Sequence, residues 1–453
     1  MIAPARVAAF EVLRVVASGR AELGSALARQ RNRLADERDR ALTGEIATGT
    51  LRWQGAFDHV IAAFADRPLG KLDPEIVDIL RMTIFQLLHL ERIPASAAVK
   101  DAVDLAGKAG KRSAAGMVNA ILRRVSRERD RLPLPGRPSD PTDRTAVLDY
   151  LSITLSHPRW LVSRWLDRWG FGDVESWTRF NNAPAPLALR ANTLRTTREA
   201  LAGQLRDAGI ETDPSPRAQD GLIVRRGNPL ATALHEEGLF FVQDEASQLV
   251  SAFADAQPGE VVLDACASPG GKTLAMSAAM RGRGLIVASD LRGRRVDLLR
   301  RTIAGSGASN VAVVQADATA PLPFGRVFDR VLLDAPCSGL GTVRRDPDIK
   351  WRRGEDDLPA LAAAQIQMLE RAADVLDDGG SIVYATCSSE PEENDAVVDA
   401  FLEAHPQFSE RVERFRTLPF RDGLEAFFAA TLVNTKDFPP HRSKNARREP
   451  RLR

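Results

Sequence analysis

Apolar residues recur at helical spacing along the first part of the chain. The runs fall in Ala9–Val16, Ile46–Leu51, Ile76–Leu90 and Ala97–Val125. Residues three or four positions apart share one face of a helix, so this spacing predicts amphipathic helices. Glycine and proline stand mainly between the runs, where helices are expected to end. The pattern therefore predicts an all-helical domain over residues 1–130.

A proline-rich segment follows these helices. Residues 131–144 (RLPLPGRPSDPTDR) contain four prolines and predict a linker. The pattern of residues 145–250 is mixed, because a tryptophan-rich helical stretch precedes the strand-like run PLALRANTLR. Further on, GLFFVQDEASQLV predicts a strand that passes into a helix. We expect a small mixed subdomain in this part of the chain.

Strand and helix patterns alternate regularly over residues 251–440. The apolar runs are VVLDA, LIVASD, VAVVQAD, RVLLDAP and SIVYATC, and helical segments such as 358–376 lie between them. This alternation predicts an α/β fold with a doubly wound, Rossmann-like parallel sheet. Four of the runs end in or next to an acid or a cysteine, at Asp264-Ala265-Cys266, Asp290, Asp317 and Cys387, and the run RVLLDAP carries Asp334 and leads to Cys337. Because such sheets bind ligands at the carboxyl ends of their strands, we expect the functional site at that edge.

Composition and charge narrow the range of partners. The chain has 453 residues, and its 62 Lys and Arg nearly balance 60 Asp and Glu, so the net charge is only +2. A nucleic-acid partner must therefore be argued from local patches. No run reaches the ~18 apolar residues of a membrane-spanning helix, and the histidines show no metal-ligand spacing. The 3 cysteines are too few for a disulfide framework. We expect a cytoplasmic monomer with no membrane segment and no metal, ending in a basic tail at 441–453.

The loop Asp264–Thr273 (DACASPGGKT) lies between a predicted strand and a predicted helix. Gly270 and Gly271 allow a tight turn and a close approach of a ligand, and the following helix N-terminus offers free N–H groups. A phosphate-binding P-loop would need glycine at position 266, which is a cysteine here. A nucleoside-binding loop is therefore favoured over an NTPase loop, and a plain strand–turn–helix connection is the alternative.

Two further strand-end acids suit an adenosine ligand. Asp290 follows the loop at the distance expected for an acid that bonds ribose hydroxyls. Asp317 could accept a hydrogen bond from an adenine amino group. A strand-end aspartate can also cap the next helix, so neither acid is decisive alone. The fingerprint GxGxxG is absent, which disfavours a nicotinamide cofactor.

Two cysteine motifs, Asp334–Gly339 (DAPCSG) and Thr386–Ser389 (TCSS), indicate the reaction. Carbon 5 of cytosine is too weak a nucleophile to take a methyl group unaided. A thiolate that adds to carbon 6 makes carbon 5 an enamine carbon that can attack a methyl sulfonium. Asp334 suits hydrogen bonding to N3 and N4 of the ring. Pro391 predicts a helix start after Cys387, and a helix N-terminus lowers a thiol pKa. Inert buried cysteines are the alternative.

The C-terminal two-thirds of the chain resembles the RNA cytosine-C5 methyltransferases of the Sun/Nop2 family. The matching strings are CASPGGK, DAPCSG, TCSS, LRANTLR, VQDEASQ and Glu392-Glu393-Asn394. The resemblance implies S-adenosyl-L-methionine as cofactor, Cys387 as the nucleophile and Cys337 as the residue that assists product release. It also implies a set of cofactor contacts: Cys266, Ala267, Ser268, Pro269, Gly270, Gly271, Lys272, Asp290, Asp317 and Asp334.

The first 130 residues are similar to the NusB family in the strings DRALTGEIATGTLR, ILRMTIFQLLHLERIP and SAAGMVNAILRRV. A NusB-like domain ahead of this catalytic domain is the arrangement of the Fmu/Sun type of bacterial 16S rRNA cytosine-C5 methyltransferase. The resemblance therefore implies ribosomal RNA as the partner. A tRNA cytosine-C5 methyltransferase and a non-catalytic RNA-binding assembly factor are the alternatives. The family's DGFF string is altered here at Asp422–Phe428.

A basic stretch after Cys337 is the candidate RNA-binding surface. It contains Arg344, Arg345 and Lys350, followed by Arg352 and Arg353 beside Trp351. Cationic groups with an aromatic ring suit unpaired RNA, because bases stack on such rings. A solvated charged loop is the alternative. Arg190 and Asn192 are further candidates. We expect a single-stranded or loop target, since the base must be unstacked to reach a buried thiolate.

Overall fold

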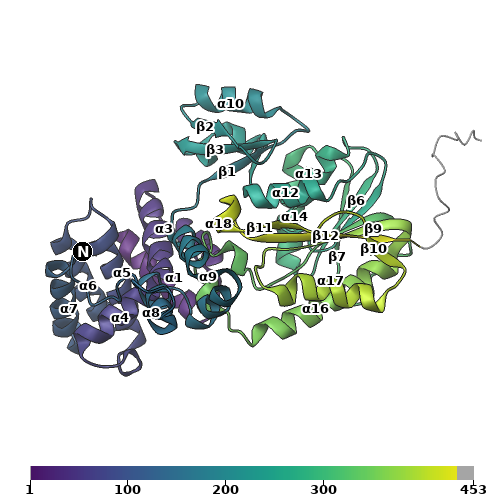
Figure 1. Cartoon of the computed structure of the whole chain (residues 1–453). Coiled ribbons are helices and arrows are strands. Elements are labelled where there is room, and N and C mark those ends of the chain that lie inside the picture. Colours follow the sequence, from purple (N-terminus) through teal and green to yellow (C-terminus); the bar gives the residue numbers. More distant parts are fainter. Residues whose placement is uncertain (1, 436–453) are drawn as a thin grey trace, which may run out of the picture. The chain divides into compact units, whose positions relative to one another are not determined.

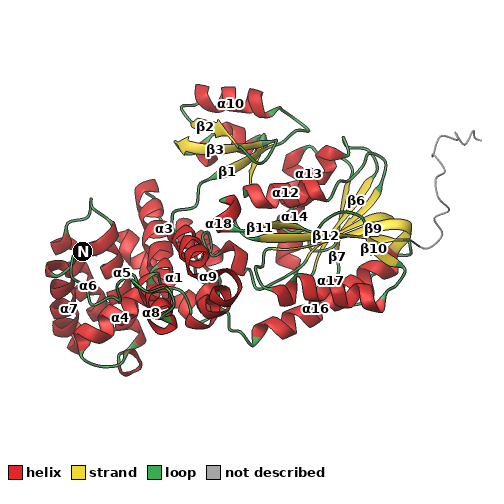
Figure 2. Cartoon of the chain, viewed as in Figure 1, coloured by secondary structure: helices red, strands yellow, loops and turns green. Residues whose placement is uncertain are grey.

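The computed structural model describes residues 2–435. They form two compact units, which we call the helical unit and the α/β unit. The helical unit contains Met1–Ala185, Ser338–Asp357 and Leu418–Glu425, and the α/β unit contains Pro186–Cys337, Leu358–Thr417 and the residues from Ala426 onward. Within the described residues, strands occur only in the α/β unit (Figure 2). The basic tail predicted at 441–453 lies outside the described residues.

The N-terminal part of the helical unit confirms the predicted helices (Figure 1). Its helices are α1 (Pro4–Ala17), α2 (Leu23–Arg31), α3 (Glu37–Arg52), α4 (Gln54–Ala65), α5 (Pro74–His89), α6 (Ala95–Lys108) and α7 (Ala115–Arg127). They enclose one apolar core, in which Ile46, Leu80 and Leu122 are fully buried. The predicted run Ala97–Val125 is two helices, because Gly110 adopts a φ of +78° just after α6 and ends it.

The predicted linker 131–144 has no regular structure before α8 (Arg144–Asp149), yet it is anchored to its own unit. Arg137 donates to both carboxylate oxygens of Glu175, on α9 (Arg159–Asn182), at 2.9 to 3.0 Å. Leu134 packs against the N-terminal core. Residues up to Ala185 therefore belong to the helical unit, whereas we expected the region from 145 onward to form one subdomain with the strands that follow.

A small antiparallel sheet begins the α/β unit. Its order is β2–β3–β1–β4, formed by β1 (Ala188–Ala191), β2 (Glu211–Pro214), β3 (Gly221–Arg226) and β4 (Phe240–Val242). The helix α10 (Arg198–Asp207) places Leu201 and Leu205 in a core with Leu189 and Leu222. The short helix α11 (Ala233–Glu236) precedes β4. Both strand-like runs predicted in this region are strands.

The large sheet has the strand order β10–β12–β9–β8–β5–β6–β7, and β11 pairs with β12. The predicted runs form β5 (Val261–Asp264), β6 (Leu285–Asp290), β7 (Val311–Gln315), β8 (Phe328–Asp334) and β9 (Leu376–Thr386), which are parallel. An antiparallel edge follows, made of β10 (Phe408–Glu410), β11 (Phe415–Thr417) and β12 (Phe427–Asn434). The Rossmann-like α/β prediction is confirmed.

Besides α10 and α11, the helices of this unit are α12 (Glu245–Phe253), α13 (Gly271–Ala279), α14 (Gly293–Ser306), α16 (Asp357–Val375) and α17 (Asp395–Ala404). Leu369, Ala372 and Val375 of α16 lie in the sheet's apolar core. Two segments leave the sheet and join the helical unit, and they carry the short helices α15 (Ile349–Arg352) and α18 (Pro419–Asp422). None of the helices within residues 2–435 has the length and apolar character that crossing a bilayer requires.

Candidate active site

The parallel register brings the predicted site residues to one edge of the sheet. Asp264 of β5 pairs with Leu332 of β8, and Asp334 of β8 pairs with Ala385 of β9. The strands therefore end together, and the loops that follow β5, β8 and β9 emerge on the same side. These are the loops that carry the glycine motif and the two cysteine motifs, so the clustering predicted from the sequence is present.

The glycine loop is tied to the end of β6. The main-chain N–H of Ser268 donates to Oδ2 of Asp290 at 3.3 Å, and Arg295 of α14 bridges the same two residues. The α13 helix begins at Gly271, directly after Gly270, whose φ is +108°. A Cβ at Gly270 would lie 2.9 Å from Cδ1 of Leu299, so a side chain here would meet both strain and a clash.

Asp264, at the base of the loop, is fully buried. Burial raises the pKa of its carboxyl to about 7, although the hydroxyl of Thr273 donates to Oδ2 at 2.6 Å and opposes the shift. Its other oxygen, Oδ1, is buried without a hydrogen-bond partner among the residues described here. A buried acceptor with no donor is costly, so this oxygen suits a positively charged or N–H-bearing ligand group.

Lys272 and Asp334 form an ion pair at the centre of the edge. Nζ of Lys272 lies 2.6 Å from Oδ2 of Asp334, and both side chains are largely buried. Burial lowers the pKa of Lys272, but Asp334 and then Cys387 and Asp264 raise it more, so the net shift is upward. The lysine therefore stays an ammonium, and its charge holds Asp334 and faces the Cys387 thiol.

The two cysteines that the motifs singled out are neighbours. Sγ of Cys337 lies 3.3 Å from Sγ of Cys387, and both are free thiols that are partly accessible to solvent. The helix expected at Pro391 is instead a 3₁₀ turn over Pro391–Glu393, and α17 begins at Asp395. The helix N-terminus therefore does not follow Cys387 as directly as predicted.

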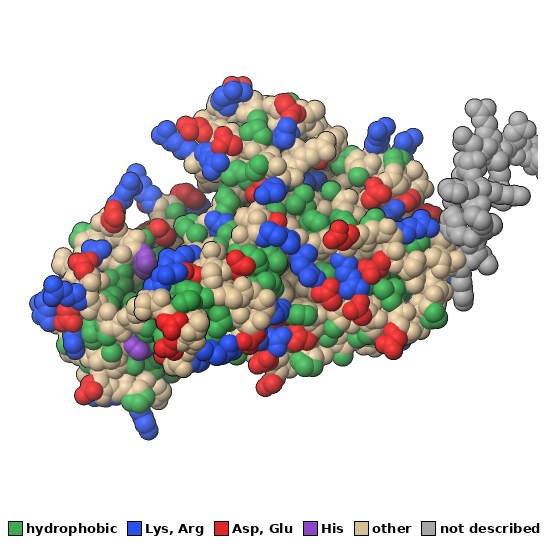
Figure 3. Space-filling view, viewed as in Figure 1, with side chains coloured by type: hydrophobic (Ala, Val, Ile, Leu, Met, Phe, Trp, Pro, Cys, Tyr) green, Lys and Arg blue, Asp and Glu red, His purple; other side chains and the backbone are tan. Residues whose placement is uncertain are grey.

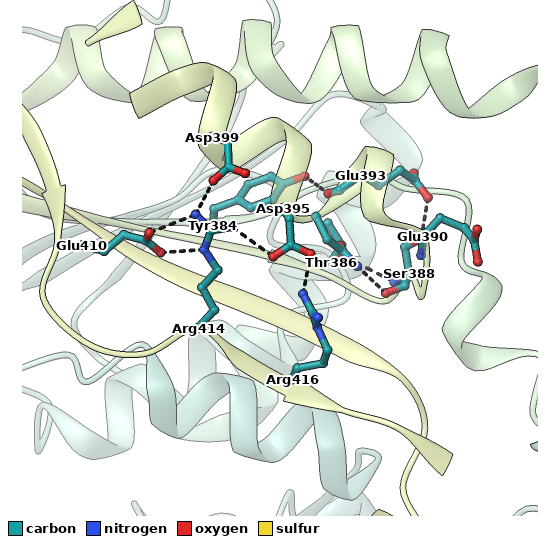
Figure 4. A network of polar contacts seen from close by, with 11 residues as sticks. Tyr384, Thr386, Ser388, Glu390, Glu393, Asp395, Asp399, Glu410, Arg414 and Arg416 are labelled. Atoms are coloured by element: carbon teal, nitrogen blue, oxygen red, sulfur yellow. Dashed lines mark hydrogen bonds and ion pairs between the residues drawn. The ribbon is translucent and has the colours of Figure 1, made fainter. Parts of the chain in front are cut away.

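Hydrogen bonds between side chains and main chain fix the Cys387 loop. The hydroxyl of Thr386 donates to Oδ1 of Asn394 at 2.5 Å, and Nδ2 of Asn394 donates to the carbonyl oxygen of Ser388 at 3.0 Å. The Ser388 hydroxyl donates to Glu393 at 2.5 Å. Figure 4 shows Thr386, Ser388 and Glu393 gathered around the turn after β9, beside a separate ion-pair group at Arg414. Thr386 and Ser388 flank Cys387, so the loop that carries the thiol is held on both sides.

Family models match three parts of the chain. The 16S rRNA methyltransferase RsmB/F model matches residues 252–433, the NusB family model matches residues 3–127, and the model of an RsmF/B-like ferredoxin-like domain matches residues 157–231. Ribosomal RNA small subunit methyltransferase B of Pseudomonas putida is 39% identical over 412 residues, covering 88% of this chain and 89% of that protein. A probable ribosomal RNA small subunit methyltransferase B of Bacillus subtilis is 35% identical over 390 residues, covering 86% and 85%. The chain belongs to this methyltransferase family.

Solved structures agree with this assignment. The crystal structure of the protein PH0851 has 26% identity and a TM-score of 0.78, over 95% of this chain and 99% of that one. NSun6 from Pyrococcus horikoshii, solved with SFG, has 21% identity and a TM-score of 0.57 over 62% and 99%, which shows the shared fold. The predicted NusB-like domain and the predicted family are confirmed. This family member is an enzyme that uses S-adenosylmethionine.

The loop residues of this methyltransferase fit S-adenosylmethionine. The bare backbone at Gly270 and Gly271 and the α13 N-terminus suit close approach of the ligand. The partnerless Oδ1 of Asp264 suits the ligand's ammonium group. Asp290 lies at the end of β6, where it would bond ribose hydroxyls, and Asp317 caps its own loop by accepting from Thr319. Hydrogen bonds from Thr319 lower the pKa of Asp317, so it remains a charged acceptor.

Two of the predicted RNA contacts are buried inside the methyltransferase. Lys350 is fully buried, and its ammonium donates to the carbonyl oxygens of Arg52 at 2.9 Å and Ser156 at 2.5 Å. Arg190 is 4% exposed and donates to Gln243 at 2.6 Å and to the carbonyl oxygen of Gly271 at 3.0 Å. These positions do not suit direct contact with RNA. We therefore correct both assignments to structural anchors within their own units.

The other predicted RNA residues are closer to the surface but are also engaged. Arg344 donates to the carbonyl oxygens of Ala183 at 3.3 Å and Pro184 at 2.6 Å. Arg345 pairs with Glu425 at 3.0 Å, and Glu425 belongs to the altered DGFF-like string. Figure 3 shows basic and acidic side chains interspersed over the face in view, in keeping with the small net charge. Both arginines keep part of their surface accessible to a ligand.

Sequence reasoning passed over three residues of the site. Asp264 stands at a predicted strand end, but neither its motif nor the family resemblance assigned it a role in the site. Gln365 and Glu393 are fully buried next to the cysteine loops. Glu393 lies in a string that carried the family resemblance, whereas Gln365 stands within a helix and has no motif around it.

Proposed function

We propose that this protein methylates carbon 5 of a cytosine in small-subunit ribosomal RNA, with Cys387 as the nucleophile and Cys337 as the group that assists release. One observation carries the chemistry: two free thiols lie 3.3 Å apart, beside the Lys272–Asp334 ion pair and the glycine loop. A cysteine with only a packing role does not require a second thiol beside it. Two thiols beside a buried ammonium suit a reaction in which a carbon–sulfur bond forms and later breaks.

In the first step Sγ of Cys387 adds to carbon 6 of the base. The Lys272 ammonium is close enough to influence the Cys387 thiol, and the charge of Cys387 is one cause of the raised pKa of Lys272. The thiolate is the attacking form of a cysteine. As the bond forms, electron density moves into the ring toward N3. Asp334, held by Lys272 at 2.6 Å, can accept a hydrogen bond from the N4 amino group as this charge develops.

Addition at carbon 6 makes carbon 5 nucleophilic, and S-adenosylmethionine supplies the electrophilic methyl group when bound. The methylated carbon 5 still carries its proton. Removal of this proton re-forms the ring double bond and expels the Cys387 thiolate, so bonds and charges balance. The 3.3 Å separation of the sulfurs supports Cys337, acting as a thiolate that becomes a thiol, as the acceptor of that proton, because a group next to the breaking bond is within reach of carbon 5.

The substrate class rests on the relatives. The two curated relatives are described as small-subunit ribosomal RNA methyltransferases, and the first part of this chain matches the NusB family. Arg344 and Arg345 are the RNA contacts that we retain from the sequence, because Lys350 and Arg190 are buried. A cytoplasmic location and a monomeric state are part of the same proposal. tRNA is the alternative substrate.

The two cysteines can be separated by a covalent-adduct experiment. Each variant is incubated with unmodified 16S rRNA and S-adenosylmethionine, and denaturing electrophoresis then detects protein that remains bound to RNA. Cys387→Ala should give no adduct and no methylation, because the attacking sulfur is gone. Cys337→Ala should accumulate an adduct, because attack and methylation proceed but release does not.

A band with Cys387→Ala and none with Cys337→Ala would mean that the roles are reversed. Retained methylation in both variants would refute covalent catalysis by either thiol. The substrate is tested separately by bisulfite sequencing of 16S rRNA and tRNA from a strain that lacks this gene. Loss of one modified cytosine in 16S rRNA supports the proposal, and loss only in tRNA contradicts it.

A further inference from the structure

One buried side chain is connected to both loops that carry the thiols. Gln365, on α16, is fully buried. Its Nε2 donates to the carbonyl oxygen of Pro336 at 3.0 Å and to Oε1 of Glu393 at 3.0 Å. Pro336 directly precedes Cys337 in the chain. Gln365 therefore holds the Cys337 loop with one N–H and uses its other N–H to reach the turn after Cys387.

Glu393 completes the connection to the second loop. Its Oε2 accepts from the hydroxyl of Ser388 at 2.5 Å, and Ser388 is the residue that follows Cys387. Its main-chain oxygen accepts from Oη of Tyr384 at 2.6 Å, on the strand that leads into the loop (Figure 4). The carboxylate of Glu393 is thus bound by Gln365 on one side and by the Cys387 loop on the other.

The donors and acceptors around position 365 match those of an amide side chain. A buried amide must have its donors and acceptor satisfied, and each group of Gln365 has a partner. The two N–H groups go to Pro336 and Glu393. Oε1 lies 3.2 Å from Oη of Tyr384, whose one proton it shares with the closer main-chain oxygen of Glu393. Burial raises the pKa of Tyr384 well above its usual value, so its hydroxyl stays a donor. A glutamate at 365 would lack the donors and would put a second carboxylate beside Glu393.

The helix that carries Gln365 is anchored in the core of the large sheet. Leu369, Ala372 and Val375 follow it on α16 and are packed into the core of the large sheet. The α16 helix runs from Asp357 to Val375, so Gln365 lies near its middle rather than at a fraying end. Both cysteine loops are therefore connected to Gln365 on this packed helix. A shift of either loop relative to the helix would break a buried hydrogen bond.

We propose that Gln365 and Glu393 are positioning residues that set the separation of the Cys337 and Cys387 sulfurs. Attack and release each need a sulfur placed to a fraction of an ångström. The hydrogen bonds that join Pro336, Gln365, Glu393 and Ser388, which we call the bridge, hold the two cysteine loops relative to each other. The role in methylation rests on the proposed function, whereas the separation of the thiols can be measured without it. Neither residue needs to touch the substrate for this role.

The first test measures the geometry directly in RNA-free, full-length protein. Diamide oxidises two adjacent thiols to a disulfide, and its azo group takes up the two electrons and two protons that the thiols lose. The rate of the Cys337–Cys387 cross-link is followed by mass spectrometry of tryptic peptides. Gln365→Leu removes the bridge. Gln367→Leu makes the same chemical change at an exposed position of the same helix and is the matched control.

We expect the cross-link to form equally fast in the wild type and in Gln367→Leu, and roughly tenfold or more slowly in Gln365→Leu, because cross-linking depends steeply on alignment. Alkylation of each thiol by iodoacetamide should be similar in all three proteins, which separates alignment from accessibility. An unchanged cross-linking rate in folded Gln365→Leu overturns the proposal. If that variant does not fold, Gln365→Asn, which keeps the amide one methylene shorter, replaces it with the same expectation.

The second test is kinetic. Loss of the bridge should lower kcat for RNA methylation by roughly 10- to 100-fold while the KM for S-adenosylmethionine stays close to that of the wild type. A merely structural defect would change both. Gln365→Glu should be impaired like Gln365→Leu, although it keeps the size of the side chain. Equal kcat in the wild type and Gln365→Leu contradicts the positioning role. A wild type that cross-links as expected but methylates no cytosine would instead count against the proposed function.

Discussion

Replacing Asp264 by asparagine should change how the stability of the protein depends on pH. Asp264 is fully buried, and burial raises the pKa of its carboxyl from 3.8 to about 7, with the Thr273 hydrogen bond opposing the shift. Between these two values the folded protein binds more protons at this site than the unfolded chain does. The contribution of Asp264 to stability is therefore fully present below pH 4 and is lost as the pH rises toward about 7.

The magnitude follows from the two pKa values. They differ by about 3 pH units, and each unit corresponds to about 1.4 kcal/mol, so wild type loses up to about 4 kcal/mol from this site as the pH rises. Asparagine keeps an acceptor oxygen for Thr273 and does not titrate. The free energy of unfolding of Asp264→Asn, relative to wild type, should therefore increase between pH 4 and pH 7. Urea denaturation followed by circular dichroism at several pH values measures this difference.

A matched control is available at another strand end. Hydrogen bonds from Thr319 lower the pKa of Asp317, so its contribution to stability is present at neutral pH and lost on acidification. Asp317→Asn should therefore be less stable than wild type at pH 7 and similar to it in strong acid, which is the opposite trend. If the curves of Asp264→Asn and wild type run parallel from pH 5 to pH 8, the carboxyl does not titrate in this range and the reasoning fails.

Two further outcomes concern the cofactor loop. Asp290→Ala should weaken S-adenosylmethionine binding by about 10- to 100-fold, because hydrogen bonds to a charged acceptor contribute roughly 1.5–3 kcal/mol of binding free energy. Unchanged affinity in calorimetry would show that Asp290 does not contact the cofactor. Gly270→Ala should lower both the melting temperature and the cofactor affinity, since φ is +108° and the new Cβ would lie 2.9 Å from Leu299. Gly305→Ala, at a helical position with open space, is its control and should leave both unchanged.

The sequence was enough to predict the helical first domain and the parallel sheet. Helical and strand periodicities are local properties, and each apolar run of the second half became the strand that its pattern indicated. The position of the chemistry was predictable for the same reason. Asp264, Asp290, Asp334 and Cys387 stand at or directly after strand ends, and the carboxyl ends of parallel strands must share one edge.

The local sequence pattern was less informative about where the helical unit ends and where individual helices begin. The segment 131–144 has the composition of a linker, but the Arg137–Glu175 ion pair anchors it to the helical unit. Glu175 lies far along the chain, so this contact leaves no local signal. The helix expected at Pro391 begins at Asp395, because the side chains of Glu393 and Asn394 bond back to the Cys387 loop.

The tertiary structure alone decided which cations are available to a ligand. Lys350 looked like part of a basic surface, since charged residues near an aromatic ring are usually solvated. Its segment instead joins the helical unit, where two carbonyl oxygens bind the buried ammonium. Arg190 is buried for a similar reason, because Gln243 and Gly271 accept its hydrogen bonds. A charge pattern does not reveal whether acceptors from distant segments will surround it.

The separation of the two thiols was also decided only by the tertiary structure. The motifs identified Cys337 and Cys387 as the reactive pair and put both at strand ends, which the sequence determined by itself. Their 3.3 Å separation depends on how the loops after β8 and β9 are held. Gln365, in the middle of a helix, holds one loop directly and the other through Glu393. Strand order and periodicity specify an edge of the sheet, whereas distances within that edge arise from side chains that meet only when the chain has folded.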